Sequence, residues 1–278
     1  MPLEEGLPLW YFYGSFTVST RKGDPWPSTP ASMVDYVSRA AAAWFAFTGD
    51  RGPFETQAAP LARYLLANGT TPKDWLWSGI PYASSDPGAL IYIGANSSRF
   101  GGCEPNVSGC RGDGIGHIEP DKAADAGRGY AILANVTGDS SFKAAALAVA
   151  DTLARLVRAP PESSASRSPW PFRVAARDGA IVEEYTSNVV SHLRLLDMLV
   201  GGPEDTTPLT LADGSKLGRT AAYHRARRLA LAWQQKYPMR NGAWTACCED
   251  VPIDNSRDNY NAVEPCVPEA PSASHSGS

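Results

Sequence analysis

The chain has 278 residues, 43% of them hydrophobic, so it can bury a sizeable core and does not have the composition of a disordered protein. Its formal net charge is -4, and no basic run interleaves with aromatic residues, which argues against nucleic-acid binding. No apolar run approaches the ~20 residues that cross a bilayer, so we expect no membrane span.

Three helix pairs of one plan follow each other along the chain. In each pair a first, apolar helix ends in a glycine-containing dipeptide, at residues 49–50, 138–139 and 201–202. A second helix follows, with apolar residues three and four apart on one face and basic or amide side chains on the other. The predicted helices span residues 32–48, 54–68, 120–137, 140–158, 184–200 and 219–237. Because a lone pair cannot bury its apolar face, we expect the three pairs to stack as antiparallel hairpins.

The first of these helices is predicted to pack in the core. Its interior carries Met33, Val37, Trp44 and Phe47 at helical spacing, which is the pattern of a buried face.

The segment 78–117 is a long glycine-rich loop that carries two of the five cysteines. Cys103 and Cys110 bracket a short run containing Gly, Pro and Asn, which can bring their Cα atoms within the ~4.4–6.8 Å that a disulfide needs. We therefore predict a bond between them, while the pairing of Cys247, Cys248 and Cys266 stays open. The sequence contains neither CxxC nor Cys/His metal spacing, so we expect no metal and no other cofactor.

Four Asn-x-Ser/Thr triplets have the form of N-glycosylation acceptors in secreted proteins. They begin at Asn68, Asn96, Asn106 and Asn135. Together with the predicted disulfide they favour a secreted or extracytoplasmic glycoprotein, although residues 1–16 lack the basic start and apolar centre of a signal peptide.

Two loops that precede first helices are rich in acids and contain glycine. One leads into the helix predicted at residue 120 and the other into the helix predicted at residue 184. If the hairpins stack around a cleft, both loops open on one rim. Two carboxylates a few ångströms apart can divide there into a protonated acid and an ionised base, as cleavage of a glycosidic bond requires. A tyrosine with histidine and arginine could instead abstract a proton beside a uronate carboxylate.

The candidate site residues come from these two loops and from the SPWPFRV segment between them. The predicted catalytic residues are Glu119, Glu183, Glu184, Tyr185 and His117. The predicted substrate-binding residues are Trp170, Arg173, Asp113, Asp121 and Asn188. Trp170 would offer a platform for a sugar ring and Arg173 a positive charge. The alternatives are core packing for the tryptophan and helix capping for the acids.

The helix pairs, with the loops GIGHIEPDKAADAGRGY, SPWPFRV and NGAW, resemble the α/α-toroid proteins, which include six-hairpin glycosidases and polysaccharide lyases. The resemblance covers residues 24–250 and implies an all-α fold of stacked helix hairpins with long loops and little strand. Six helices are half of what a six-hairpin toroid has, so it implies an incomplete toroid over residues 1–265. Residues 266–278 form a Ser/Pro/Gly-rich tail that we expect to be disordered. An open flank would be covered by a second copy or by a missing C-terminal half.

The resemblance and the acidic loops together imply a carbohydrate-active enzyme, a hydrolase or lyase that cleaves glycosidic bonds of an oligo- or polysaccharide. Two alternatives stay open. One is a non-catalytic or degenerate toroid that binds glycan or serves as a scaffold. The other is an isoprenoid-type toroid enzyme, which is disfavoured because DKAAD at residues 121–125 is not the aspartate-rich metal motif of terpenoid cyclases.

Overall fold

A computed structural model describes residues 29–81, 117–164, 167–183, 185–186 and 189–236, together with short strands near both ends. These strands are β1 (Leu3–Glu4), β2 (Leu7–Pro8), β3 (Ser15–Thr17), β4 (Lys22–Asp24) and β11 (Val251–Pro252). The predicted disulfide between Cys103 and Cys110 and the predicted tail at 266–278 lie outside the described residues. No helix in the described ranges is both long and apolar enough to cross a membrane.

The described part of the chain is mostly helical, and all six predicted helices are present. They are α2 (Thr29–Thr48), α3 (Ala59–Asn68) with the π-helical turn η1 (Phe54–Ala58) before it, α4 (Pro120–Thr137), α5 (Ser140–Leu156), α6 (Val190–Val200) and α7 (Arg219–Lys236). The periodicity of the sequence therefore predicted which segments are helical, and most boundaries agree to within a turn.

The turn between α4 and α5 shows why the Gly-Asp dipeptides mark helix ends. Gly138 adopts a left-handed conformation with φ of 74°, and its N–H donates to the Ala134 carbonyl, which closes α4. The next residue, Asp139, accepts hydrogen bonds from the Ser141 N–H at 2.9 Å and from its hydroxyl at 2.6 Å, which opens α5. One dipeptide thus ends a helix and starts its antiparallel neighbour.

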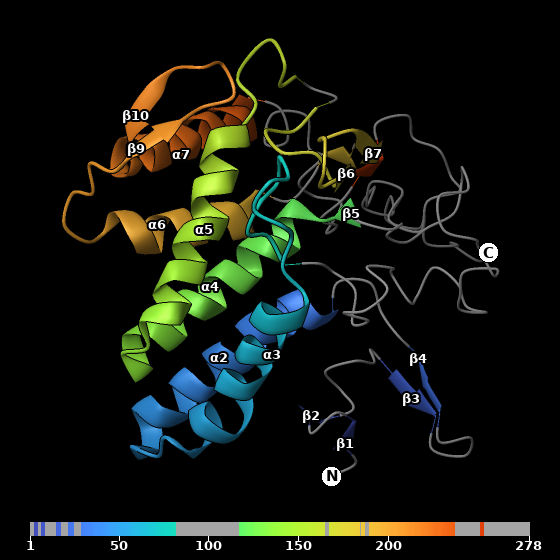
Figure 1. Cartoon of the computed structure of the whole chain (residues 1–278), viewed down its shortest axis with the longest axis vertical. Helices are drawn as coiled ribbons and strands as arrows, with labels where there is room; N and C mark the ends of the chain where they lie inside the picture. The colour runs from blue at the N-terminus through green and yellow to red at the C-terminus, as the bar shows by residue number, and fades with distance from the viewer. Residues whose placement is uncertain are drawn as a thin grey trace, which may run out of the picture.

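Helix α4 is the centre of the helical part (Figure 1). It packs against α2 on one side and α6 on another, while α5 lies across it and also contacts α7. One apolar cluster fills the space among α2, α3 and α4, and a second joins α5, α6 and α7. The first helices of the three pairs therefore adjoin in chain order, as the repeat predicts.

Glycine at two positions allows neighbours to approach α4 closely. A Cβ on Gly129 would lie 2.8 Å from the Val34 carbonyl and 2.9 Å from the Asp35 nitrogen, both backbone atoms of α2. A Cβ on Gly127 would instead meet side chains, with Leu195 Cδ2 at 2.6 Å and Val149 Cγ1 at 3.0 Å, and no backbone atom of another helix is among these close neighbours. We expect Gly129→Ala to lower the free energy of unfolding by about 1–3 kcal/mol, because two helices must separate, despite a helix-propensity gain of ~1 kcal/mol.

The matched control for this prediction is Gly127→Ala, on the same helix and two residues before Gly129. Urea denaturation of both variants measures the difference. A Gly127 variant as destabilised as the Gly129 variant would show that the close approach of α2 is not the cause.

Two aromatic residues of α2 contradict the prediction that they lie in the core. Trp44 is 50% exposed and Phe47 is 90% exposed, whereas Val34 and Ala41 are buried. Helical spacing identifies which residues share a face, but it does not show whether a neighbouring element covers the whole length of that face.

The prediction that one helix begins at residue 184 is also wrong, because α6 begins at Val190. The residues before it form strands β7 (Ile181–Glu183) and β8 (Tyr185–Thr186). These segments contain β-branched and aromatic residues, which favour strand over helix.

Strand β7 belongs to a three-stranded antiparallel sheet with β5 (His117–Ile118) and β6 (Arg173–Ala175), in the order β5-β6-β7. Strand β8 pairs with β11, and β9 (Pro208–Thr210) forms a hairpin with β10 (Lys216–Gly218) just before α7. The three-stranded sheet lies at the N-terminal end of α4, because β5 leads directly into that helix (Figure 1). This is the place where the two acidic loops come together.

Candidate functional site

The three-stranded sheet brings two of the acidic segments and the arginine of the SPWPFRV segment into one row. Ile118 is paired with Val174, so the next residue of the chain, Glu119, adjoins Arg173. On the other side of β6, Arg173 is paired with Glu183. Residues directly opposite each other in antiparallel strands share a face of the sheet. The backbone register therefore places a carboxylate residue on each side of one arginine.

Glu119 and Arg173 form a buried ion pair. The Arg173 Nη2 donates to Glu119 Oε1 at 2.5 Å, and the two residues are only 4% and 3% exposed. The ring of Phe172 lies under the guanidinium, with 5.0 Å between Cζ and the ring centroid. Glu119 occupies the N-cap position of α4, yet its side chain makes no capping hydrogen bond. Its carboxylate therefore serves the arginine rather than the helix end.

Helix α4 carries two further acids, Asp121 and Asp125, on the face that leads inward from the sheet, here called the acidic face. Asp121 is buried, and its Oδ2 lies 2.9 Å from the Lys122 Nζ. Its Oδ1 is buried without a hydrogen-bond partner in the described part of the chain. One turn further along, burial raises the pKa of Asp125 from 3.8 to about 6, with Ser191 of α6 donating to it. The face thus presents two buried carboxylates, and the environment of Asp125 disfavours its charged form.

A second arginine–carboxylate ion pair, between Arg128 and Asp35, lies at the inner end of this face of α4. Asp35 of α2 accepts from Arg128 Nε at 2.7 Å and from Arg128 Nη2 at 2.5 Å, and also from Arg39 Nε at 2.8 Å. Asp125 lies close to the same arginine, with 3.7 Å between its Oδ1 and Arg128 Nη2. Asp35 belongs to no motif, and Arg128 lies within the segment GIGHIEPDKAADAGRGY without having been singled out, so sequence reasoning missed both as site residues.

The charge of Asp125 should make stability depend on pH. Because its pKa is higher in the folded state, the folded protein binds more protons than the unfolded chain between pH ~4 and ~6, so stability falls as the pH rises through this window. Asp121, Lys122 and Arg128 on α4, Asp35 on α2 and Ser191 on α6 are the polar groups around it. Asp125→Asn should therefore be more stable than the parent at pH 8, by about 1–3 kcal/mol, and similar to it at pH 4.

Thermal unfolding of parent and variant across pH 4–8 measures this difference. A difference that grows toward low pH would contradict the expected sign and show that Asp125 is stabilised as a carboxylate.

Trp170 is fully buried in this structure. Its indole Nε1 donates to the Leu153 carbonyl at 2.9 Å, and its ring stacks on His192 with 4.1 Å between centroids and an interplanar angle of 8°. The structure thus places Trp170 in the core, which is the alternative to the sugar platform. His192 was not a predicted site residue, and its place on the apolar face of its helix was the only signal.

The other predicted site residues are placed only in part. His117, Glu183 and Tyr185 are located as backbone positions in β5, β7 and β8. Asp113, Glu184 and Asn188 lie outside the described residues. Within the described residues, no group of three or more His, Cys, Asp or Glu side chains is arranged to hold a metal ion.

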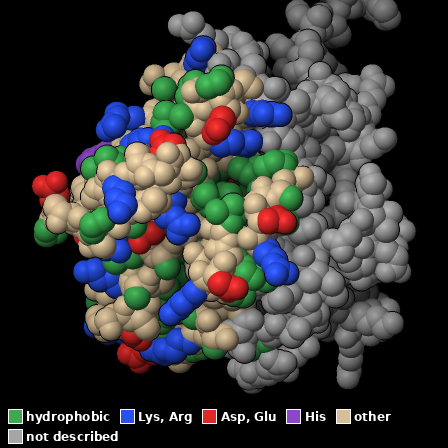
Figure 2. All heavy atoms as spheres, turned by 45° about the horizontal axis from the view of Figure 1, so that its top comes forward, with side chains coloured by type: hydrophobic (Ala, Val, Ile, Leu, Met, Phe, Trp, Pro, Cys, Tyr) green, Lys and Arg blue, Asp and Glu red, His purple; other side chains and the backbone are tan. Residues whose placement is uncertain are grey.

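The surface around these elements carries charges of both signs. Figure 2 shows basic and acidic side chains interspersed over the described part of the visible face, without a continuous basic surface there. A nucleic-acid backbone would favour a patch of one sign.

No protein-family model, curated protein or solved structure matches the chain. Function therefore has to follow from the chemistry of these residues.

Proposed function

We propose that the protein is a carbohydrate-active enzyme that cleaves glycosidic bonds of an oligo- or polysaccharide, on a fold that is an incomplete α/α toroid. The observation that carries the proposal is the row of Glu119, Arg173 and Glu183 across the three-stranded sheet. Hairpins that stack in chain order support the toroid. Two separate segments bring a carboxylate to one place, which is what cleavage by an acid and a base needs.

The spacing of the row favours hydrolysis with inversion. Neighbouring strands lie about 4.8 Å apart, so two strand intervals separate the Cα positions of Glu119 and Glu183 by roughly 10 Å. Inverting enzymes hold their carboxyl groups about 6.5–9.5 Å apart to admit a water, whereas retaining enzymes need about 5–5.5 Å. The roughly 10 Å between these two backbone positions favours the wider arrangement.

The ion pair suggests how the roles divide. Glu119 accepts a hydrogen bond from the Arg173 guanidinium, and we assign it the role of the base that activates water. Glu183 or Glu184 would then be the acid that protonates the leaving oxygen. The positive charge between the two acids would also attract a hydroxyl-rich or acidic substrate, with His117, Tyr185 and Asn188 as further contacts to it.

A substrate screen tests the proposal. The whole chain is incubated with neutral and uronate-containing polysaccharides, and new reducing ends, unsaturated uronates and the anomeric proton signals of the products are followed. New reducing ends with inverted anomers are the expected result. Unsaturated products would show a lyase that uses the same residues differently. Glycan binding without cleavage, or no interaction with any glycan, would overturn the proposal.

A further inference from the structure

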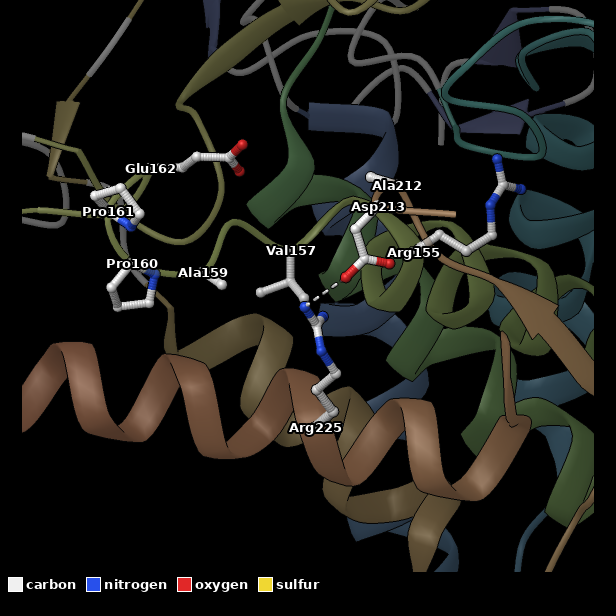
Figure 3. Close-up of a pocket in the computed structure, with 9 residues that line it drawn as sticks. All are labelled: Arg155, Val157, Ala159, Pro160, Pro161, Glu162, Ala212, Asp213 and Arg225. Carbon is white, nitrogen blue, oxygen red and sulfur yellow. Dashed lines mark ion pairs between the residues drawn. The ribbon is translucent and has the colours of Figure 1, made fainter. Parts of the chain in front are cut away.

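A pocket of about 240 Å³ lies away from the sheet, where the segment after α5 meets the β9–β10 hairpin and α7 (Figure 3). Val157, Pro160 and Pro161 form an apolar wall. The hairpin contributes Asp213, and α7 contributes Arg225. The volume is below the ~300–1,000 Å³ of pockets for drug-sized ligands, so the pocket suits a single small ring.

Two charged side chains of this pocket, Arg225 and Glu162, are poorly satisfied. Arg225 Nη2 lies 3.8 Å from Asp213 Oδ2, too far for a hydrogen bond, and its side chain is 24% exposed. By contrast, Arg128, Arg173 and Arg219 each contact a carboxylate oxygen at 2.5 Å. Glu162, on the opposite wall, makes no side-chain hydrogen bond or ion pair in the described part of the chain. A donor on one wall, Arg225, and carboxylate acceptors on both walls are therefore available to a ligand.

The Asp213 carboxylate, one of the two acceptors in the pocket, is held in place by the turn between β9 and β10. Asp213 Oδ1 accepts from the Ser215 N–H at 2.9 Å and from its hydroxyl at 2.6 Å. These hydrogen bonds keep the pKa of Asp213 below its usual value, so the carboxylate stays charged at neutral pH. Figure 3 shows Asp213 and Arg225 facing each other, with Glu162 across the pocket.

We propose that this pocket binds one acidic sugar residue, a hexuronate. The sugar carboxylate would take the unused donors of Arg225 in a bidentate contact. Ring hydroxyls would donate to Glu162 and Asp213, which only accept. The carbon face of the ring would pack on Val157 and the two prolines. A neutral sugar would leave the guanidinium with only the Asp213 carboxylate, 3.8 Å away, as a charged acceptor. The identification of the ligand as a sugar rests on the proposed function. The charges of Arg225, Asp213 and Glu162 are observed independently of it.

Direct binding to the whole chain tests this inference without requiring turnover. D-Glucuronate, D-glucose and L-alanine are titrated separately by calorimetry and by ligand-observed NMR. We expect glucuronate to bind with a dissociation constant near the millimolar range, and Arg225→Met to weaken it at least tenfold. Glu162→Gln, an exposed change that should not affect folding, should weaken it several-fold. The control is Arg227→Met, two residues along α7, where the arginine pairs with Asp197 outside the pocket.

Three outcomes would contradict the assignment of this pocket to a hexuronate. Equal binding of glucose would remove the need for the acid group, and binding of alanine alone would show an amino-acid site. Glucuronate binding that survives both pocket substitutions would place the ligand elsewhere.

If glucuronate binds through Arg225 while no glycan is cleaved, the pocket assignment stands and the proposed function falls. Cleavage without glucuronate binding gives the reverse result.

Discussion

Replacing Arg128 with methionine should lower the free energy of unfolding by about 3–5 kcal/mol, because it leaves a buried carboxylate without its main partner. Asp35 is 0% exposed, and Arg128 meets both of its oxygens from Nε and Nη2. The Arg128 side chain is itself only 8% exposed, so water cannot replace it without opening the contact between α2 and α4. Urea denaturation at neutral pH measures the loss.

Arg39 provides the matched control, because it contacts the same carboxylate from the surface. Its Nε lies 2.8 Å from Asp35 Oδ2, and its side chain is 46% exposed. We expect Arg39→Met to cost less than about 1 kcal/mol, since an exposed pair is screened and its donor is solvated when free. The double variant Arg128→Met with Asp35→Asn should recover part of the loss. Equal costs for the two arginines would contradict the assignment of the main role to burial.

The helices were predictable because their signals are local. The periodic apolar residues of α5 and the Gly138-Asp139 turn lie within a few residues of the elements that they determine. A left-handed glycine and a capping aspartate act on the nearest backbone groups, so their effect does not depend on the rest of the fold.

The site was predictable only as a set of residues, because its contacts are long-range. Glu119 and Arg173 are 54 residues apart, and their pairing depends on the register of β5 against β6. Trp170 has the same neighbours in sequence whether it is exposed or buried, and its contacts with residues distant in sequence, among them Leu153 and His192, decide which it is. Asp35 occupies a buried position of its helix, and the periodicity of the sequence does not distinguish it from a solvent-exposed acid. Only its contact with Arg128 of α4 does so.

The ion pair changes what is expected of Glu119→Gln. On sequence alone, loss of a catalytic carboxylate should reduce turnover and leave stability nearly unchanged. In the structure the same change leaves Arg173 buried without its carboxylate, so we expect a loss of about 3–5 kcal/mol in the free energy of unfolding as well. Turnover of the substrate found in the screen should fall by ~10²–10⁴-fold. The single variant therefore cannot separate a catalytic from a structural role.

The double variant Glu119→Gln with Arg173→Met separates the two roles. It removes both buried charges, so most of the lost stability should return. If Glu119 is the base, turnover should stay at least 10²-fold below the parent even though the fold is restored, because the carboxylate that activates water is gone. If Glu119 only anchors Arg173, stability and turnover should recover together. Urea denaturation and initial rates, measured on the parent, both single variants and the double variant, give the coupling between the two residues for each property. Joint recovery would remove Glu119 from the catalytic pair and leave the base to another acid of the rim.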